Sequence, residues 1–227
     1  MKSSIFLLFI FLTITTPPFL SAESRGVVIN EIAWMGTPVE GVEEKQWWRY
    51  ELLELFNAGD QEVSLQGWRV ELRSGELLEF TILLYGVLPA KEYFLVGASD
   101  KISGLNVNYA TLSGKFKNSG QRVVLKDGAG LVVEEIDAQE GWFAGDNELK
   151  LTMERRFFDR AVADPENWGS SAIEGGTPKA QNSVFGKEAF LKLDSIQQYD
   201  LTKKDSLWSS FVQTITNTVF ILSLIHI

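Results

Sequence analysis

The sequence predicts an all-β fold, an antiparallel β-sandwich. About eight or nine short apolar runs recur roughly every ten residues, which is the spacing typical of sandwich strands. Gly, Pro, Asn and Asp separate the runs, and no 3.6-residue periodicity lies between them to suggest crossover helices. The chain has 227 residues, 45% of them hydrophobic, with 19 glycines. This composition suits one sizeable core.

The N-terminal segment, residues 1–22, is predicted to be an export signal. Lys2 provides a short positive region, residues 5–14 are apolar, and small residues precede position 23. Leu20 fits the usual small-residue cleavage pattern poorly, so an uncleaved N-terminal anchor is the alternative. Either interpretation places the folded domain outside the cytoplasm, as a secreted or membrane-anchored protein.

The predicted strands follow in order along residues 26–183. Residues 27–34 (VVINEIAW) are apolar on both faces, which is typical of a buried strand. Residues 51–68 indicate strand, turn and strand, with turn residues at 57–60, and this feature is expected to organise the domain. Gly67 marks a bulge or a close backbone approach. Further strands are predicted at residues 69–72, 77–84, 93–96, 107–112, 122–126, 131–136 and 149–156.

The loop at residues 35–49 contains the candidate binding residues Trp47, Trp48 and Arg49. Two adjacent indoles in an extended segment cannot both face one core, so at least one should be exposed or cover an edge. Loops on rigid scaffolds often contain binding residues. We therefore expect this loop to contact protein or glycan.

Residue usage excludes several kinds of catalytic site. The chain has no cysteine and one histidine, His226. Thiol nucleophiles, disulfides, cysteine-ligated zinc and Ser-His-Asp triads are therefore excluded from the domain. The acidic residues Asp159, Asp164 and Glu166 lack the alternation of an EF-hand loop, which favours a solvated loop over calcium binding. We expect no cofactor, no metal and no enzyme activity.

The formal net charge is −9, so nucleic acid would meet mostly like charge. The lysines and arginines are scattered along the chain, and Arg155-Arg156 is the only adjacent basic pair in residues 26–183. Nucleic acid is therefore an unexpected partner.

Glu31 and Glu54 lie in the middle of apolar strands. Paired carboxylates are the requirement of glycoside hydrolysis, so a hydrolase of cell-wall or polysaccharide material is the alternative function. Buried carboxylates are more often paired inside a fold, and Arg155, between Met153 and Phe157, is the predicted ion-pair partner of one of them.

Several short motifs follow one another in a definite order along residues 26–183. They are Asn30-Glu31-Ile32-Ala33-Trp34, Glu51 to Asn57, Leu65-x-Gly67-Trp68, Leu88-Pro89-Ala90, Val124-Leu125-x-Asp127 before Val132-Val133, Gly141-Trp142, Met153-Glu154-Arg155, Gly176-Thr177-Pro178 and Gln181-Asn182. Together they resemble the bacterial lamin-tail domain, an immunoglobulin-like sandwich. Two departures are Leu52, where the family usually has Trp, and Lys179, where Gly is common. The resemblance implies a non-catalytic binding or interaction module, and a purely structural spacer is a further alternative.

Beyond the domain, residues 184–205 have mixed charge and are predicted to be a linker. Residues 206–227 contain no Asp, Glu, Lys or Arg, and their length of about 20 residues matches a bilayer span. Gln213 and Asn217 lower the hydrophobicity of this stretch, and no basic residues follow it. A membrane segment is therefore expected, with a loose amphipathic tail or an incomplete reading frame as alternatives.

Overall fold

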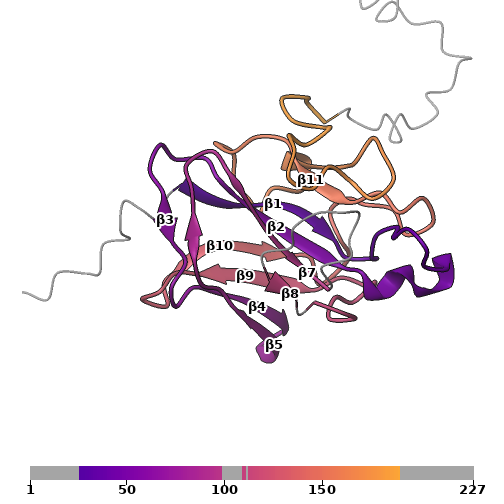
Figure 1. Ribbon diagram of the computed structural model, residues 1–227, viewed down its shortest axis with the longest axis horizontal. Helices are drawn as coiled ribbons and strands as arrows, with labels where there is room; N and C mark the ends of the chain where they lie inside the picture. The colour runs from indigo at the N-terminus through magenta and orange to yellow at the C-terminus, as the bar shows by residue number, and fades with distance from the viewer. Residues whose placement is uncertain (1–25, 99–108, 111, 190–227) are drawn as a thin grey trace, which may run out of the picture. The chain divides into compact units, whose positions relative to one another are not determined.

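The computed structural model describes residues 26–98, 109–110 and 112–189, which are almost entirely β-structure (Figure 1). Two 3-10 helices interrupt the strands, η2 (Glu44–Arg49) and η3 (Pro165–Asn167). The strands are β1 (Val27–Ala33), β2 (Leu52–Asn57), β3 (Val63–Ser64), β4 (Arg69–Ser74), β5 (Leu77–Leu83), β6 (Val87–Leu88), β7 (Tyr93–Gly97), β8 (Tyr109–Ala110), β9 (Arg122–Lys126), β10 (Val132–Asp137), β11 (Met153–Arg155) and β12 (Trp168–Ser170).

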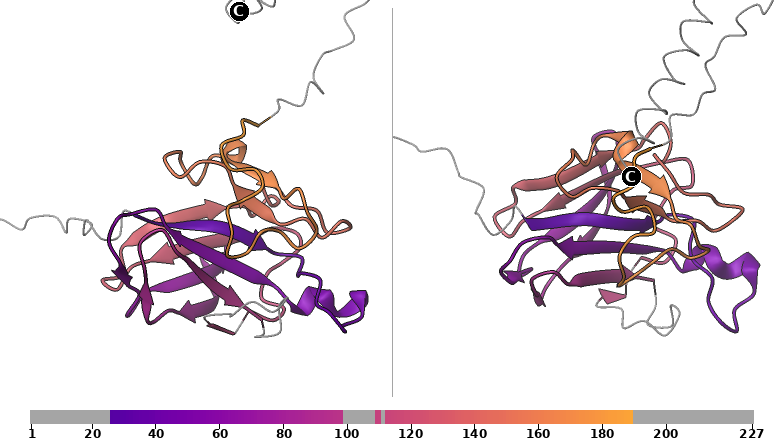
Figure 2. Two further views of the ribbon diagram at one scale, coloured as in Figure 1. Left: turned by 45° about the horizontal axis from the view of Figure 1, so that its top comes forward. Right: turned by 90° about the horizontal axis from the view of Figure 1, so that it is seen from above.

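The strands form an immunoglobulin-like sandwich of two main sheets (Figure 2). One sheet has the order β12-β11-β1-β2-β7-β8, the other has the order β10-β9-β4-β5, and β3 pairs with β6 separately. Among the strands that the structure describes, the parallel pair β7–β8 is the exception to antiparallel pairing. The predicted antiparallel sandwich is confirmed.

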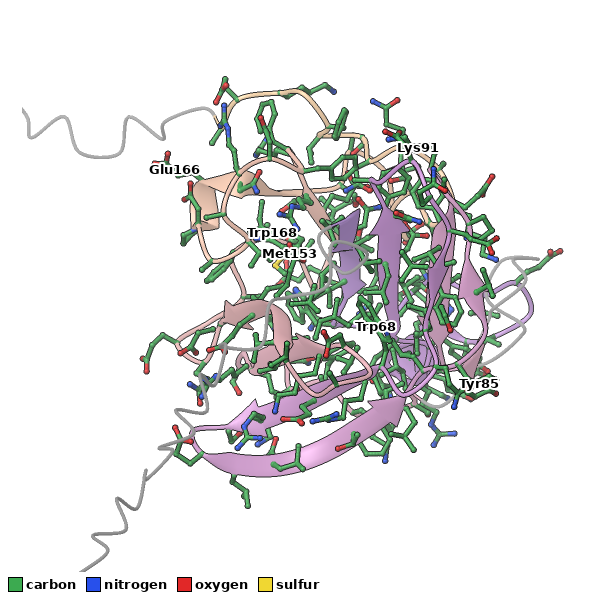
Figure 3. All side chains as sticks on the ribbon, turned by 90° about the vertical axis from the view of Figure 1, so that its left-hand side faces the viewer. Trp68, Tyr85, Lys91, Met153, Glu166 and Trp168 are labelled. Atoms are coloured by element: carbon green, nitrogen blue, oxygen red, sulfur yellow. The ribbon has the colours of Figure 1, made fainter. Side chains whose placement is uncertain are left out.

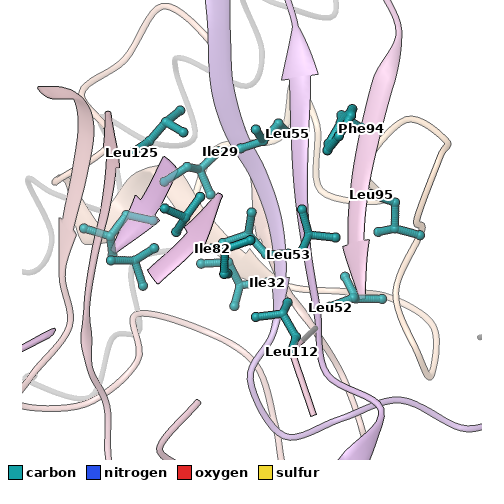
Figure 4. Packing of buried hydrophobic residues seen from close by; sticks show 14 of the residues in the cluster. Ile29, Ile32, Leu52, Leu53, Leu55, Ile82, Phe94, Leu95, Leu112 and Leu125 are labelled. Atoms are coloured by element: carbon teal, nitrogen blue, oxygen red, sulfur yellow. The ribbon is translucent and has the colours of Figure 1, made fainter. Parts of the chain in front are cut away.

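Side chains from the two sheets meet in one core (Figure 4). Alternation along a strand sends every second residue inward, and burying one Leu or Ile contributes about 1.5–3 kcal/mol. The fully buried residues of this core include Ile29, Ile32, Leu53, Leu55, Val70, Leu72, Ile82 and Leu125.

Two strand predictions differ from the structure. Residues 51–68 do not form a hairpin, because β2 pairs on both edges with β1 and β7 while β3 pairs with β6. Gly67 does make the predicted close approach, since a Cβ there would lie 3.4 Å from Cα of Gly128. Strand β12 lies where no strand was predicted. Its Trp168 lies in the interior with Met153, whereas Glu166 lies at the periphery (Figure 3).

A closing segment, residues 176–184, follows β12 and runs over the first sheet. The orange part of the chain lies on the side of β1 and β2 that faces away from β4 and β9 (Figure 1). Packing continues beyond Ser183, the expected end of the domain. Val184 is buried, and the ring of Phe185 lies 4.8 Å from that of Phe158. The sandwich therefore includes the first residues of the predicted linker.

Several predictions concern residues outside those described. The export signal at 1–22, the linker from 190 onward and the proposed membrane segment at 206–227 all belong to this group. Within the described ranges, no helix has the length and apolar character needed to cross a bilayer.

Candidate binding surface and buried carboxylate row

Trp47, Trp48 and Arg49 lie on helix η2, not on an extended segment, and none of the residues of this helix is buried. The Trp48 side chain is 49% exposed, as predicted for at least one of the two indoles. Trp47 is half-buried, and its Nε1 donates to the carbonyl of Val42 at 3.0 Å. The Trp48 indole is thus the aromatic group that this helix offers to solvent.

The Trp48 ring is held in place from two directions. The guanidinium carbon of Arg49 lies 5.1 Å from the ring centroid, a distance at which cation–π attraction operates. A Cβ added to Gly114 would lie 2.9 Å from Cζ3 of the ring, so the backbone packs closely against the indole. The support of this surface by Gly114 could not be predicted from the sequence, because Gly114 and Trp48 are far apart along the chain.

Three glutamates form a row across adjacent strands of the first sheet. Glu31 of β1 pairs in register with Glu54 of β2 and with Glu154 of β11. All three have 0% exposed surface. We call these residues the carboxylate row. Glu154 was not predicted as part of it, although it is the central residue of the Met153-Glu154-Arg155 motif.

Neutral hydrogen-bond donors, many of them from the closing segment, bind most of the carboxylate oxygens of the row. Such bonds are needed because a buried charge without partners is costly. Oε2 of Glu31 is the exception, since it is buried without a partner among the described residues. The bonds are Thr152 Oγ1 and Thr177 N to Glu31, Asn30 Nδ2 and Lys179 N to Glu54, and Thr177 Oγ1, Ser183 Oγ and Val184 N to Glu154.

Burial changes the acidity of the row. Removal from water raises the pKa of Glu54 to about 7, against the lowering effect of the hydrogen bonds from Lys179 and Asn30. Removal from water, followed by the charge of Glu54, raises the pKa of Glu31 well above its usual value. Glu31 and Glu54 therefore hold their protons more readily than exposed glutamates do.

The predicted ion pair of Arg155 with Glu31 or Glu54 is wrong. Nη1 of Arg155 instead binds Oε1 of Glu134 at 2.6 Å, and the guanidinium also donates to the carbonyls of Ile29, Phe157 and Arg160. Successive side chains of a strand point to opposite faces. Arg155 follows Glu154 in β11, so it points away from the face that carries the carboxylate row.

The carboxylate row does not resemble a hydrolytic site. Glycosidases hold two carboxyl groups roughly 5–9.5 Å apart across a cleft that admits substrate. Here Glu31 and Glu54 are sealed beneath the closing segment, so substrate has no access to them in this conformation.

The acidic loop after β11 serves a local structural purpose. The Asp164 side chain accepts a hydrogen bond from the backbone N of Glu166 at 3.0 Å and thereby caps η3. In the described part of the chain, no group of three or more His, Cys, Asp or Glu residues is arranged to hold a metal ion.

Comparison with known proteins agrees with the fold. The sequence model of the lamin tail domain matches residues 21–140, more than half of the chain. A search of curated proteins finds no match. The match includes β1 to β10 and Glu31 and Glu54 of the carboxylate row, and it ends before β11 and the closing segment. The chain belongs to the lamin tail domain family.

Proposed function

We propose that the chain is a non-catalytic, extracytoplasmic interaction module that binds protein or glycan at the cell envelope through Trp48 and Arg49. The observation that supports this proposal most strongly is the half-exposed Trp48 indole on a helix with no buried residue. A purely structural spacer would be expected to pack this ring. A hydrolase would need carboxylates that solvent can reach, and Glu31 and Glu54 are not accessible.

The chemistry of this surface suits both partner classes. Tryptophan and arginine are the residues most enriched among those that dominate binding energy at protein interfaces. An exposed indole also presents a flat apolar face with a polar N–H at its edge. Because Arg49 and Gly114 already hold the ring, little side-chain entropy remains to be lost on binding.

The test compares the full chain with two variants, Trp48→Ala and Leu149→Ala. Leu149 is a matched control because it is 61% exposed and belongs neither to η2 nor to the residues that hold the Trp48 ring. Binding to a glycan array and to envelope proteins is measured by surface retention and cross-linking. We expect Trp48→Ala to weaken binding about tenfold, the loss of one hot-spot contact, and Leu149→Ala to leave it unchanged. Equal binding by all three proteins would contradict the proposal.

The location outside the cytoplasm requires its own test. Cells expressing the full chain are compared with cells expressing a version that stops at Lys204. The proposal expects both proteins outside the cytoplasm, and a tail anchor retains only the full chain on membranes after an alkaline wash. Recovery of both proteins from the cytoplasmic fraction would reject the export part of the proposal.

A further inference from the structure

A small cavity lies beside the carboxylate row and shares no residue with the Trp48 surface. Its volume is about 220 Å³. Sites for drug-sized ligands measure roughly 300–1,000 Å³, so this cavity fits a head group or one side chain. The lining consists of four aromatic rings and three side-chain amides.

The aromatic rings contact one another in a continuous series. Ring centroids are 4.8 Å apart for Tyr93 and Phe56, 4.7 Å for Phe56 and Phe158, and 4.8 Å for Phe158 and Phe185. Tyr93 and Phe56 come from β7 and β2, whereas Phe158 and Phe185 come from the chain after β11. Aromatic faces carry negative potential and attract cations that approach within about 6 Å.

The amide groups of the two buried asparagines that line the cavity, Asn30 and Asn182, already donate hydrogen bonds within the protein. Nδ2 of Asn30 donates to Oε1 of Glu54 at 2.8 Å and to Oδ1 of Asn182 at 2.9 Å. Nδ2 of Asn182 donates to the carbonyls of Asn30 and Arg155. Each side-chain oxygen can accept more than one hydrogen bond, so these two asparagines can still accept hydrogen bonds from a ligand.

Carboxyl groups lie directly behind these two asparagines, and they carry negative charge once the pH is high enough to ionise them. Glu54 binds Asn30 and adjoins Glu31, and Glu154 completes the row. Lys179 is the cation that acts on Glu54 from the closing segment. Burial, and then the charges of Glu54, Glu92 and Glu31, raise the pKa of Tyr93, so its hydroxyl stays neutral.

From this geometry we infer that the cavity binds an organic ammonium group, carried either by a lysine side chain or by a small quaternary amine. The aromatic walls, the oxygens of Asn30 and Asn182 and the carboxyl groups behind them favour a cation over a neutral or anionic head group. A metal ion is a poor match, because hard cations require several directly coordinating oxygens and no carboxylate lines the cavity.

The test measures saturation-transfer NMR binding to the purified full chain. Tetramethylammonium and Nα-acetyl-lysine amide represent the two sources of the ammonium group. Neopentyl alcohol and Nα-acetyl-norleucine amide are their neutral controls in shape. We expect saturable binding by at least one ammonium probe and none by either control. The probe that binds identifies the source.

Two variants separate the ring contribution from general packing. Phe185→Leu removes an aromatic wall but keeps apolar volume, and we expect it to weaken ammonium binding about fivefold, the value of one cation–π contact. Phe157→Leu is the control, because Phe157 does not line the cavity. Trp48→Ala should leave this binding unchanged, which separates the two sites.

The pH dependence tests the contribution of charge. Glu54 has a pKa of about 7, so it is mostly protonated at pH 6 and mostly ionised at pH 8. Ammonium binding should therefore be about threefold tighter at pH 8. Any one of four results would overturn the inference. They are equal binding of the neutral controls, preferential binding of a monosaccharide, weaker ammonium binding at pH 8, and no saturable binding at all.

Discussion

Glu31 and Glu54 face each other across β1 and β2, and neither forms an ion pair in the part of the chain that the structure describes. Hydroxyls, amides and backbone N–H groups hold these carboxyl groups instead of cations. This arrangement makes the stability of the domain depend on the protonation of these buried carboxyl groups.

The free energy of unfolding is expected to decrease as pH rises from about 5 to 8.5. Glu54, with its pKa raised from 4.5 to about 7, and Glu51, with its pKa raised to about 8, hold protons in the folded state that the unfolded chain has released. Each pKa unit corresponds to about 1.4 kcal/mol, so Glu54 alone contributes a loss on the order of 3 kcal/mol. Urea unfolding across this range measures the slope. A slope that Glu54→Gln fails to reduce would contradict this origin.

Below about pH 4.5, the free energy of unfolding should change with pH in the opposite direction and decrease as the pH falls. Burial of Glu71 opposes ionisation, but Lys126, Arg69 and Arg73 outweigh it and lower the pKa to about 2. Its stabilising effect is present above pH 4.5 and is lost as pH falls toward 2. Stability should therefore peak near pH 5. In the variant Glu71→Gln the decrease below pH 4.5 should be smaller, which the same urea titration detects.

Gly176→Ala should destabilise the domain strongly. Gly176 has φ +77°, and a Cβ there would overlap Oε1 of Glu31 and Oγ1 of Thr152. Gly186 has φ +73° with open space around it, so Gly186→Ala isolates the backbone cost of about 1–2 kcal/mol. Thermal unfolding should show a loss for Gly176→Ala larger by about 2 kcal/mol or more. Equal losses would mean that the closing segment does not press on the carboxylate row.

Arg155→Leu should cost about 3–5 kcal/mol, because it leaves the Glu134 carboxylate and three backbone carbonyls without their donor. Arg122→Leu removes a more exposed pair with Glu135 and should cost less than about 1 kcal/mol. Chemical denaturation measures both. Similar small losses would show that the buried pair is dispensable.

Random duplex DNA should not bind measurably at physiological salt. The net charge is −9, and Arg69, Arg73 and Lys126, although clustered on β4 and β9, all bind Glu71. Fluorescence anisotropy at low and physiological salt checks this expectation. Micromolar, salt-sensitive binding would refute it.

The strand pattern of the sandwich could be predicted because it depends on local alternation. The runs at 27–34, 93–96 and 122–126 correspond closely to β1, β7 and β9. Pairing partners could not be predicted in the same way. The pairing of β1 with β11, and the contact of Lys126 with Glu71, join residues that are distant in sequence.

The candidate site, too, could be predicted only in part. Exposure of Trp48 followed from two adjacent indoles, and burial of Glu31 and Glu54 followed from their apolar neighbours. The ion-pair partner of Arg155 could not be predicted, because the register of β11 decides on which face each of its side chains lies. The series of rings around the cavity also depends on the path of the closing segment, which has no regular pattern.

The position of β1 between β2 and β11 has a consequence for how the chain acquires its structure. Glu31 pairs with Glu154 and accepts a hydrogen bond from the backbone N of Thr177. The contacts of the first strand can therefore form in full only after most of the domain has been synthesised. Contacts of such long sequence separation slow folding, because loop-closure entropy is lost before the contacts form. Until the chain beyond β11 is present, Glu31 and Glu54 lack the hydrogen-bond donors that Thr177 and Lys179 provide in the complete domain.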